Sequence, residues 1–260
     1  MSSNSIIAQA VNLKAAYDDR FILKGVDLDI PEKKITTIIG GSGSGKTTLL
    51  KHFIGLLRQV EGEVTVFGNS WTHMDEKQRE TTQRRIGVLF QNGALLGSKS
   101  IETNIAIPLE QHTKLSASVI NRVVRLKLKQ VGLQSAADRM PSELSGGMRK
   151  RAALARALAL DPPLLFCDEP SAGLDPVTSF QLDQLLLDLR DSLGLTIVVV
   201  THEIASINRI ADQIAYLENG EMIFAGSLSD AVTDSPESVS NFFSTGGLTK
   251  QSLSTVTKNA

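Results

Sequence analysis

Residues 35–50 read "ITTIIGGSGSGKTTLL", and this stretch decides the fold of the chain. Its first five residues are apolar or β-branched and predict a buried strand. A glycine-rich turn comes next, and the residues after it predict a helix. The apolar positions of that helix are Leu49, Leu50, Phe53, Ile54 and Leu57. The order of strand, glycine loop and helix is the setting that a phosphate-binding loop requires.

The glycine turn has the spacing G-x-x-x-x-G-K-[ST] of that loop, with Lys46 and Thr47 at its end. Glycines let backbone N–H groups surround phosphates, and the helix N-terminus adds roughly half a positive charge. Lys46 is expected to bridge the outer phosphates, and Thr47 to offer its hydroxyl to Mg²⁺. The alternative is a flexible Gly/Ser linker, which the apolar flanks argue against. The predicted nucleotide-binding residues are Gly40, Gly41, Ser42, Gly43, Ser44, Gly45, Lys46, Thr47 and Thr48.

Composition limits the class of protein. The chain has 260 residues, of which 42% are hydrophobic, enough for a full-sized core. Lys and Arg (27) nearly balance Asp and Glu (28), so nucleic acid is not an expected partner. The single cysteine, Cys167, lies in an apolar run and is expected to be a small buried side chain. No apolar stretch approaches the roughly 20 residues of a membrane helix, and the N-terminus lacks the pattern of a signal peptide.

The wider pattern predicts an α/β fold. Apolar runs alternate with turn residues before Pro31, which favours antiparallel strands, and further strands are expected at residues 62–68 and 85–91. Residues 101–160 read as mainly helical. From Pro162 onward strands and helices alternate, which predicts a mostly parallel sheet with helices on both faces.

The sequence also predicts where several helices and the last hairpin end or turn. The helix with Leu182, Leu185, Leu186, Leu189 and Leu193 is expected to stop at Gly194. The helix beginning near Ser145 is expected to end at Asp161-Pro162-Pro163. Residues 215–226 predict a hairpin that turns at Asn219–Gly220. From Ser244 the chain is rich in Ser, Thr and Gly, which is typical of a flexible tail.

Two acids follow the apolar run "LLFC" directly, namely Asp168 and Glu169. The carboxyl ends of parallel strands are where such a sheet delivers its ligand-binding groups. Asp168 fits the acidic partner of a Mg²⁺ shell, and Glu169 is placed to polarise an attacking water. Adjacent acids are also common on solvated surfaces, but carboxylates so close to buried residues are costly unless they are paired or metal-bound.

A second glycine pair lies in "LSGGM", residues 144–148, with no lysine between Ser145 and Gly147. The residues after it are strong helix formers. By itself this motif is more often a helix cap than half of a binding site.

Taken in order, "GGSGSGKTT", Gln91 in "FQNG", "LSGGM", "LLFCDEP", "SAGLDP" and "THE" resemble the nucleotide-binding subunit of ABC transporters. The resemblance runs from about Tyr17 to residue 230. It implies a P-loop NTPase fold with a mostly parallel core sheet, an antiparallel β subdomain and an inserted α-helical subdomain. The ATPase domain would span residues 1–245, with the helical subdomain at about 92–160, and the flexible tail residues 246–260.

The resemblance also implies the roles of residues. Two copies would associate head to tail, each ATP lying between the phosphate loop of one and the "LSGG" of the other, with Mg²⁺ as cofactor. Glu169, His202 and Gln91 would be catalytic, and Thr47, Gln91 and Asp168 would bind the metal. Ser145, Gly146, Gly147 and Asp175 would bind ATP in trans, while Tyr17 would stack on adenine. Outside this set, the same residue types would count as packing, surface or turn residues.

Met148 stands where most members of the family have glutamine or glutamate, and a thioether cannot supply a strong hydrogen bond. Activity is expected to survive, because Ser145 and the two glycines make the phosphate contacts. Residues 89–115 and 139–162 resemble the ATPases of MCE-type lipid transporters, as in the Mla phospholipid system. That branch implies an integral membrane permease, an MCE-domain lipid-binding protein and, in some systems, a STAS-domain protein.

The expected function is therefore ATP hydrolysis that drives phospholipid movement between bacterial membranes, with the chain peripheral on the cytoplasmic face of the inner membrane. Two alternatives remain open. The chain could energise a small-solute ABC importer, since cargo contacts lie on other subunits. Less in keeping with its single compact set of motifs, it could be a soluble ABC ATPase of DNA repair or of ribosomes.

Overall fold

The computed structural model describes residues 5–18 and 20–248. The buried apolar run becomes strand β3 (Ile35–Ile39), in which every residue is buried. It lies inside a six-stranded sheet of order β10-β9-β3-β8-β7-β6. The other strands are β6 (Ile86–Leu89), β7 (Leu164–Asp168), β8 (Thr196–Val200), β9 (Gln213–Glu218) and β10 (Glu221–Gly226). Only β10 runs antiparallel to its neighbour, which confirms the mostly parallel core sheet.

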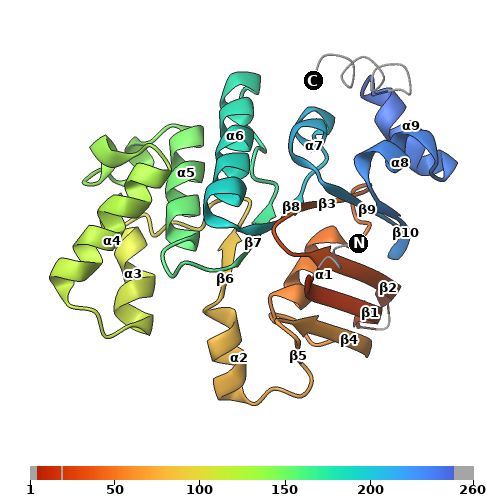
Figure 1. Cartoon of the computed structure of the whole chain (residues 1–260), viewed down its shortest axis with the longest axis horizontal. Helices are drawn as coiled ribbons and strands as arrows, with labels where there is room; N and C mark the ends of the chain where they lie inside the picture. The colour runs from red at the N-terminus through yellow and green to blue at the C-terminus, as the bar shows by residue number, and fades with distance from the viewer. Residues whose placement is uncertain (1–4, 19, 249–260) are drawn as a thin grey trace.

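A second sheet is antiparallel and has the order β2-β1-β4-β5. Its strands are β1 (Ile6–Tyr17), β2 (Arg20–Pro31), β4 (Glu61–Val66) and β5 (Asn69–Ser70). Helix α1 (Lys46–Phe53) packs between the two sheets, because its Leu49, Leu50 and Phe53 share one core with residues of both. The antiparallel strands expected before Pro31 are confirmed, and they support the helix that follows the phosphate loop (Figure 1).

A group of helices lies on the other side of the main sheet (Figure 1). It comprises α3 (Ile101–His112), α4 (Ala117–Gln130), the short turns η1 (Gln134–Ala136) and η2 (Pro141–Glu143), and α5 (Gly146–Ala157). Their apolar faces share the largest core cluster with α6 (Pro176–Leu193) and strand β8. The expectation of a mainly helical segment from 101 to 160 is confirmed.

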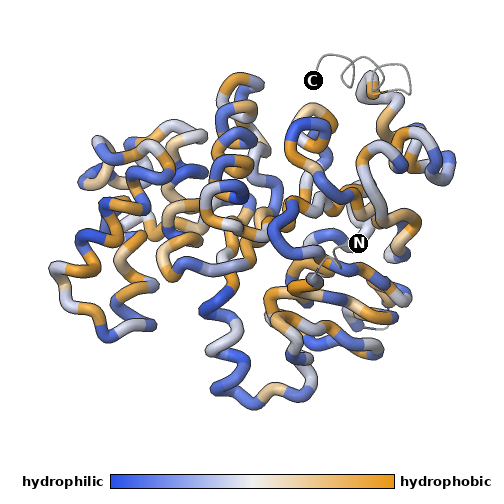
Figure 2. Tube along the Cα trace, viewed as in Figure 1, coloured by the Kyte–Doolittle hydropathy of each residue, from blue (hydrophilic) through white to orange (hydrophobic). Residues whose placement is uncertain are grey.

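Helix α2 (Glu76–Gln83) is not predicted by the sequence pattern. Each of its residues is at least partly exposed, and Figure 2 shows it as a hydrophilic segment beside more apolar strands. Asp75 and Gln78 form a capping box at its start. This helix depends on its cap more than on an apolar face, so hydrophobic periodicity could not reveal it.

Two expected helix ends differ from the structure. Helix α1 stops at Phe53, before the expected Leu57, because Gly55 has φ +72° and a Cβ there would lie 3.0 Å from the Trp71 ring. Helix α5 stops at Ala157 and not at the Asp161-Pro162-Pro163 segment, which comes after an intervening turn. In contrast, α6 ends at Gly194 as expected, with φ +64°.

The last part of the chain forms α7 (Ile204–Ile210), α8 (Leu228–Thr233) and α9 (Glu237–Thr245). The hairpin turn at Asn219–Gly220 is confirmed, with positive φ at both residues. Ser244 and Thr245, which the sequence predicts to lie in a flexible tail, belong to α9, and Leu248 is buried in a cluster with Phe243. The rest of the expected flexible tail, residues 249–260, lies outside the described residues.

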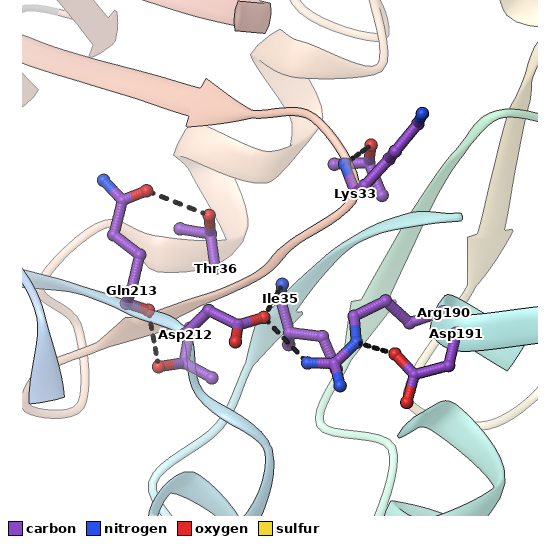
Figure 3. A network of polar contacts seen from close by, with 9 residues as sticks. Lys33, Ile35, Thr36, Arg190, Asp191, Asp212 and Gln213 are labelled. Atoms are coloured by element: carbon purple, nitrogen blue, oxygen red, sulfur yellow. Dashed lines mark hydrogen bonds and ion pairs between the residues drawn. The ribbon is translucent and has the colours of Figure 1, made fainter. Parts of the chain in front are cut away.

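A polar network fixes the start of β3, at the end opposite the phosphate loop (Figure 3). The Asp212 carboxylate accepts from the Ile35 N–H at 2.8 Å and from Arg190 Nη1 at 2.9 Å. Thr36 donates to the Gln213 side chain at 3.3 Å. These bonds tie the start of β3 to β9, and Arg190 joins Asp212 to the end of α6. Over residues 5–18 and 20–248, no helix has the length and apolar character to cross a membrane.

Candidate functional site

The phosphate loop lies at the carboxyl end of β3 and leads into α1. Gly40 has φ +145°, and a Cβ there would lie 2.0 Å from the carbonyl oxygen of Leu217 on β9. Only glycine lets the loop pass so close to the neighbouring strand. Gly45 caps α1 in a left-handed conformation, with no side-chain cap among the described residues. The first N–H groups of α1 are therefore directed at whatever occupies the loop, which is the geometry of an anion site.

Lys46 folds back over this loop. Its ammonium donates to the carbonyl oxygens of Gly40 at 2.9 Å and Gly41 at 2.8 Å. Burial lowers the pKa of Lys46, while the charges of Glu169 and Asp168 act in the opposite direction. The side chain is thus held at the loop, where it can exchange carbonyl contacts for phosphate oxygens.

The two acids expected after β7 lie beside the loop. Asp168 Oδ2 is 3.5 Å from the Thr47 hydroxyl, and the Asp168 side chain is largely buried. Burial and the neighbouring charge of Glu169 raise the pKa of Asp168, whereas Thr47 lowers it. A carboxylate in this environment is stabilised by a nearby cation, so the pair fits Mg²⁺, which takes one or two protein oxygens beside substrate phosphates. This supports Thr47 and Asp168 as metal-binding residues.

Glu169 has the geometry of a group held for one task. Its backbone adopts φ +48°, a conformation that is uncommon for residues other than glycine. Glu169 Oε1 lies 3.0 Å from His202 Nδ1, and Oε2 is buried without a hydrogen-bond partner among the described residues. An unpaired buried carboxylate oxygen is available to accept a proton from a water molecule. The structure therefore brings together Lys46, Thr47, Asp168, Glu169 and His202.

The second glycine pair forms a different group with the start of α6. Ser145 is the N-cap of α5, and its hydroxyl accepts from the Met148 N–H at 3.3 Å. A Cβ on Gly147 would lie 2.3 Å from Cγ2 of Thr178, so the helix start fits closely against α6. Asp175 caps α6 and accepts from the Thr178 N–H at 3.0 Å. The residues predicted to bind ATP in trans thus lie at the packed starts of α5 and α6, and Asp175 also serves as the cap of α6.

Met148 is partly buried and packs against the helical core. Its side chain contributes apolar contact at the position where a glutamine would offer a polar group. The polar support behind the helix start comes from elsewhere: Arg149 donates to the carbonyl oxygen of Leu144 at 2.8 Å.

The remaining predicted residues are placed as follows. Gln91 follows β6 and is exposed, but its carbonyl oxygen accepts a hydrogen bond from Lys150 Nζ. Gln91, Gly146 and Lys150 line the same small pocket. Tyr17 ends β1 with its side chain 48% exposed, so its adenine role stays a prediction. Within the loop, Ser42 and Gly43 are exposed, Ser44 is buried and Thr48 is half-buried.

Lys150 is a buried residue beside the site that is not among the predicted site residues. It is 8% exposed and donates to the carbonyl oxygens of both Gln91 and Glu169. In the sequence it is one of three consecutive basic residues, Arg149–Arg151, which resemble a solvated run of charge. Helical spacing from Gly147 was the available signal, because residues three apart share a face of a helix.

The geometry is that of a nucleotide site completed by a second surface. The first group can grip phosphates, position a cation and activate water. The second group has backbone N–H groups and a serine hydroxyl at a helix N-terminus. Such a division suits a reaction in which both surfaces must meet around one nucleotide.

Comparison with known proteins gives one consistent family. Residues 23–172 match the ABC transporter family. The intermembrane phospholipid transport system ATP-binding protein MlaF of Escherichia coli strain K12 is 43% identical over 209 residues, which cover 80% of this chain and 78% of MlaF. The probable ribonucleotide transport ATP-binding protein mkl of Mycobacterium leprae is 38% identical over 237 residues, which cover 91% of this chain and 68% of mkl.

Among solved structures, the ATP-binding cassette MJ0796 in a dimeric post-hydrolysis state with ADP and phosphate matches with a TM-score of 0.77. It is 32% identical, and the match covers 85% of this chain and 98% of that one.

Proposed function

Since the chain belongs to the ABC transporter family and is an ATPase of that family, we propose that it energises phospholipid transport between bacterial membranes. The assignment of phospholipid as the cargo rests on the likeness to MlaF, whose name states intermembrane phospholipid transport. Residues 139–162, which include Met148, resemble the ATPases of this branch. Phospholipid would be moved by other subunits, while the chemistry takes place on this chain.

Two copies would bind ATP head to tail. The phosphate loop of one copy, Gly40–Thr48, would hold the phosphates, and Ser145–Gly147 of the other would close on the γ-phosphate. The half-exposed ring of Tyr17 is suited to stacking on adenine. The solved MJ0796 cassette is described as dimeric and bound to ADP and phosphate, which supports this arrangement.

Hydrolysis would depend on Glu169 as the general base. Its free Oε2 would accept the proton of the attacking water, while His202 holds Oε1 and contacts the γ-phosphate. Lys46 would neutralise the outer phosphates. Thr47, Asp168 and the side chain of Gln91 would hold Mg²⁺, which supplies neutralisation of the phosphate charge when bound. The loss of γ-phosphate contacts would then let the two copies separate.

The proposed partners are an integral membrane permease, an MCE-domain lipid-binding protein and, in addition, a STAS-domain protein. The chain would then act as a peripheral subunit on the cytoplasmic face of the inner membrane. Contacts with the permease would lie on the Gln91 segment, residues 91–94, and on the helical subdomain at about 92–160.

Purification of the native complex in mild detergent tests the cargo and partners together. We expect a permease, an MCE-domain protein and bound phospholipid in the same fraction. The complex is then placed in donor vesicles with fluorescent phospholipid, and ATP-dependent transfer to acceptor vesicles is measured beside the same complex carrying Glu169→Gln. Lipid transfer that does not require ATP, or that is unchanged in the Glu169→Gln complex, would contradict phospholipid transport by this ATPase.

A small-solute transporter is the second candidate, because mkl is named for ribonucleotide transport. Its permease would co-purify without an MCE-domain protein or lipid. In that outcome the ATPase chemistry would stand and the phospholipid assignment would fail.

A further inference from the structure

Lys150 is a buried lysine outside the set of residues assigned to ATP or Mg²⁺. It lies one turn into α5, the helix that begins at the second glycine pair, and its exposure is only 8%. Burial lowers its pKa, and the acids Glu169 and Asp168 act against that shift. Burial of a lysine ammonium costs free energy unless the group is hydrogen-bonded, so the partners of Lys150 indicate its role.

The Lys150 ammonium joins two segments that are far apart in sequence. It donates to the carbonyl oxygen of Gln91, two residues after the end of β6, and to that of Glu169, directly after β7, the latter at 3.1 Å. Both acceptors are backbone atoms of residues proposed to act in hydrolysis, Glu169 as the general base and Gln91 as a Mg²⁺ ligand. One side chain therefore fixes the main chain of both.

The contact with Glu169 falls at a strained point. Glu169 has φ +48°, and its N–H donates to the carbonyl oxygen of Val200 at 2.8 Å. With Lys150 on its carbonyl oxygen, the peptide groups on both sides of this residue are held. A residue in this region of backbone space keeps its conformation only when its surroundings impose it. Loss of the lysine contact would leave the direction of the Glu169 carboxylate less well determined.

The Gln91 segment is attached to the same helix at further points. Arg156 donates to the carbonyl oxygens of Gly93 at 3.0 Å and Ala94 at 2.6 Å. A Cβ on Gly93 would lie 3.2 Å from the Cβ of Ala153, so the segment packs closely on α5. The segment and α5 therefore form one unit, and Lys150 connects that unit to the end of β7.

We infer that Lys150 is a positioning residue for ATP hydrolysis, which links the helix of the second glycine pair to the backbone of Gln91 and Glu169. The link within one protomer rests on the contacts above. A role of this link in communication between the two sites rests on the proposed head-to-tail dimer. Closure of Ser145–Gly147 on the partner's ATP would fix the position of α5. Lys150 would then fix the position of Glu169, the general base in its own protomer.

The test is Lys150→Met in the full chain, which keeps the length of the side chain and removes the donor. We expect kcat to fall about 10- to 100-fold, because an error of about 1 Å in a catalytic group can cost about a hundredfold. The dissociation constant for ATP should stay within about twofold, since Lys46 and the phosphate loop are unchanged. Lys150→Gln retains a neutral donor and should give an intermediate kcat; it also serves if the methionine variant does not fold.

Lys127→Met is the matched control. Lys127 is also a buried lysine of the helical group, 1% exposed, but its ammonium pairs with Asp161 at 2.5 Å, away from the site. It should lower the unfolding temperature and leave kcat near that of the unchanged chain. The inference is overturned if Lys150→Met and Lys150→Gln keep full kcat, or if the loss equals that of Lys127→Met, or if it follows weaker ATP binding. ATP-driven dimerisation of a Glu169→Gln chain is measured separately, so failure of the dimer is distinguished from failure of the link.

Discussion

Helices α1 and α5 both start beside glycine-rich segments, and their starts differ in how they use backbone N–H groups. At α1 the N-cap is Gly45, with a lysine directly behind it and no side-chain cap among the residues described. At α5 the N-cap is Ser145, whose hydroxyl occupies the Met148 N–H. The first start follows a buried parallel strand, and the second follows the short turn η2.

The difference teaches that the two starts have separate tasks. A lysine, an open helix end and two nearby acids suit the first start to the proposed binding of nucleotide phosphates in its own protomer. The second start is packed on α6 through Gly147 and Thr178, and its cations Arg149 and Lys150 donate to backbone carbonyl oxygens. It is suited to completing a nucleotide site that another surface already holds, and the following substitutions test this division.

Glu169→Gln should have the largest effect. Removal of a general base costs about 10²- to 10⁴-fold in turnover, and the amide cannot accept the proton of water. ATP binding and ATP-dependent dimerisation should persist, because both glycine starts are unchanged. Steady-state ATPase rates and size-exclusion chromatography with MgATP provide the measurements. Full turnover in this variant would remove Glu169 from the base role.

Lys46→Ala should act on the first start alone. Without the ammonium at the loop, the dissociation constant for ATP should rise about tenfold or more, since one charge-assisted hydrogen bond contributes about 1.5–3 kcal/mol. Nucleotide titration by fluorescence or calorimetry measures the loss. Lys51→Ala, on the same helix, is the control for removing a lysine. Unchanged ATP affinity in Lys46→Ala would contradict a binding role for the first start.

Gly147→Ala should act on the second start. The added methyl would meet Thr178 at 2.3 Å, so α5 must shift and kcat should fall about tenfold, with ATP binding to the single protomer retained. Thr178→Ser removes the obstructing methyl and keeps the hydroxyl that bonds Asp175 at 2.5 Å. The double variant should therefore regain activity, and Thr178→Ser alone should behave like the unchanged chain. If the double variant stays as slow as Gly147→Ala, steric contact is not the cause.

The smallest effect is expected from pH, through the helix that supports the second start. Asp183 on α6 is buried, which raises its pKa, although bonds from Ser206 and Arg209 partly oppose this. Near and above the ordinary pKa, the folded chain keeps this proton while the unfolded chain loses it. Stability from this group is thus greatest at low pH and is lost as pH rises through the raised pKa.

Thermal unfolding of the unchanged chain and of Asp183→Asn, from pH 4 to pH 7, checks the sign. Relative to Asp183→Asn, the unchanged chain should lose a few degrees of unfolding temperature as pH rises. The opposite slope would mean that the bond to Arg209 outweighs burial.

The sequence by itself determined the first start, the mostly parallel sheet and the position of the acid pair. These features are local: Gly40 and Asp168 directly follow apolar runs, Glu169 is the next residue, and Lys46 ends the glycine-rich turn. Chain order fixes the loop and the acid pair to strand ends. The family motifs also placed Ser145 and Gly147 correctly at the start of a helix. Helix α2 was not predicted from the sequence, because it has a capping box but no apolar face.

Only the tertiary structure decided which distant groups meet. Lys150 reads as one member of a basic run, but the fold buries it against two carbonyl oxygens that lie 59 and 19 residues away in sequence. The contact of Gly147 with Thr178 and the pairing of Glu169 with His202 arise in the same way. Periodicity reports which side of a helix is buried, whereas partners across the core depend on how strands and helices pack in three dimensions.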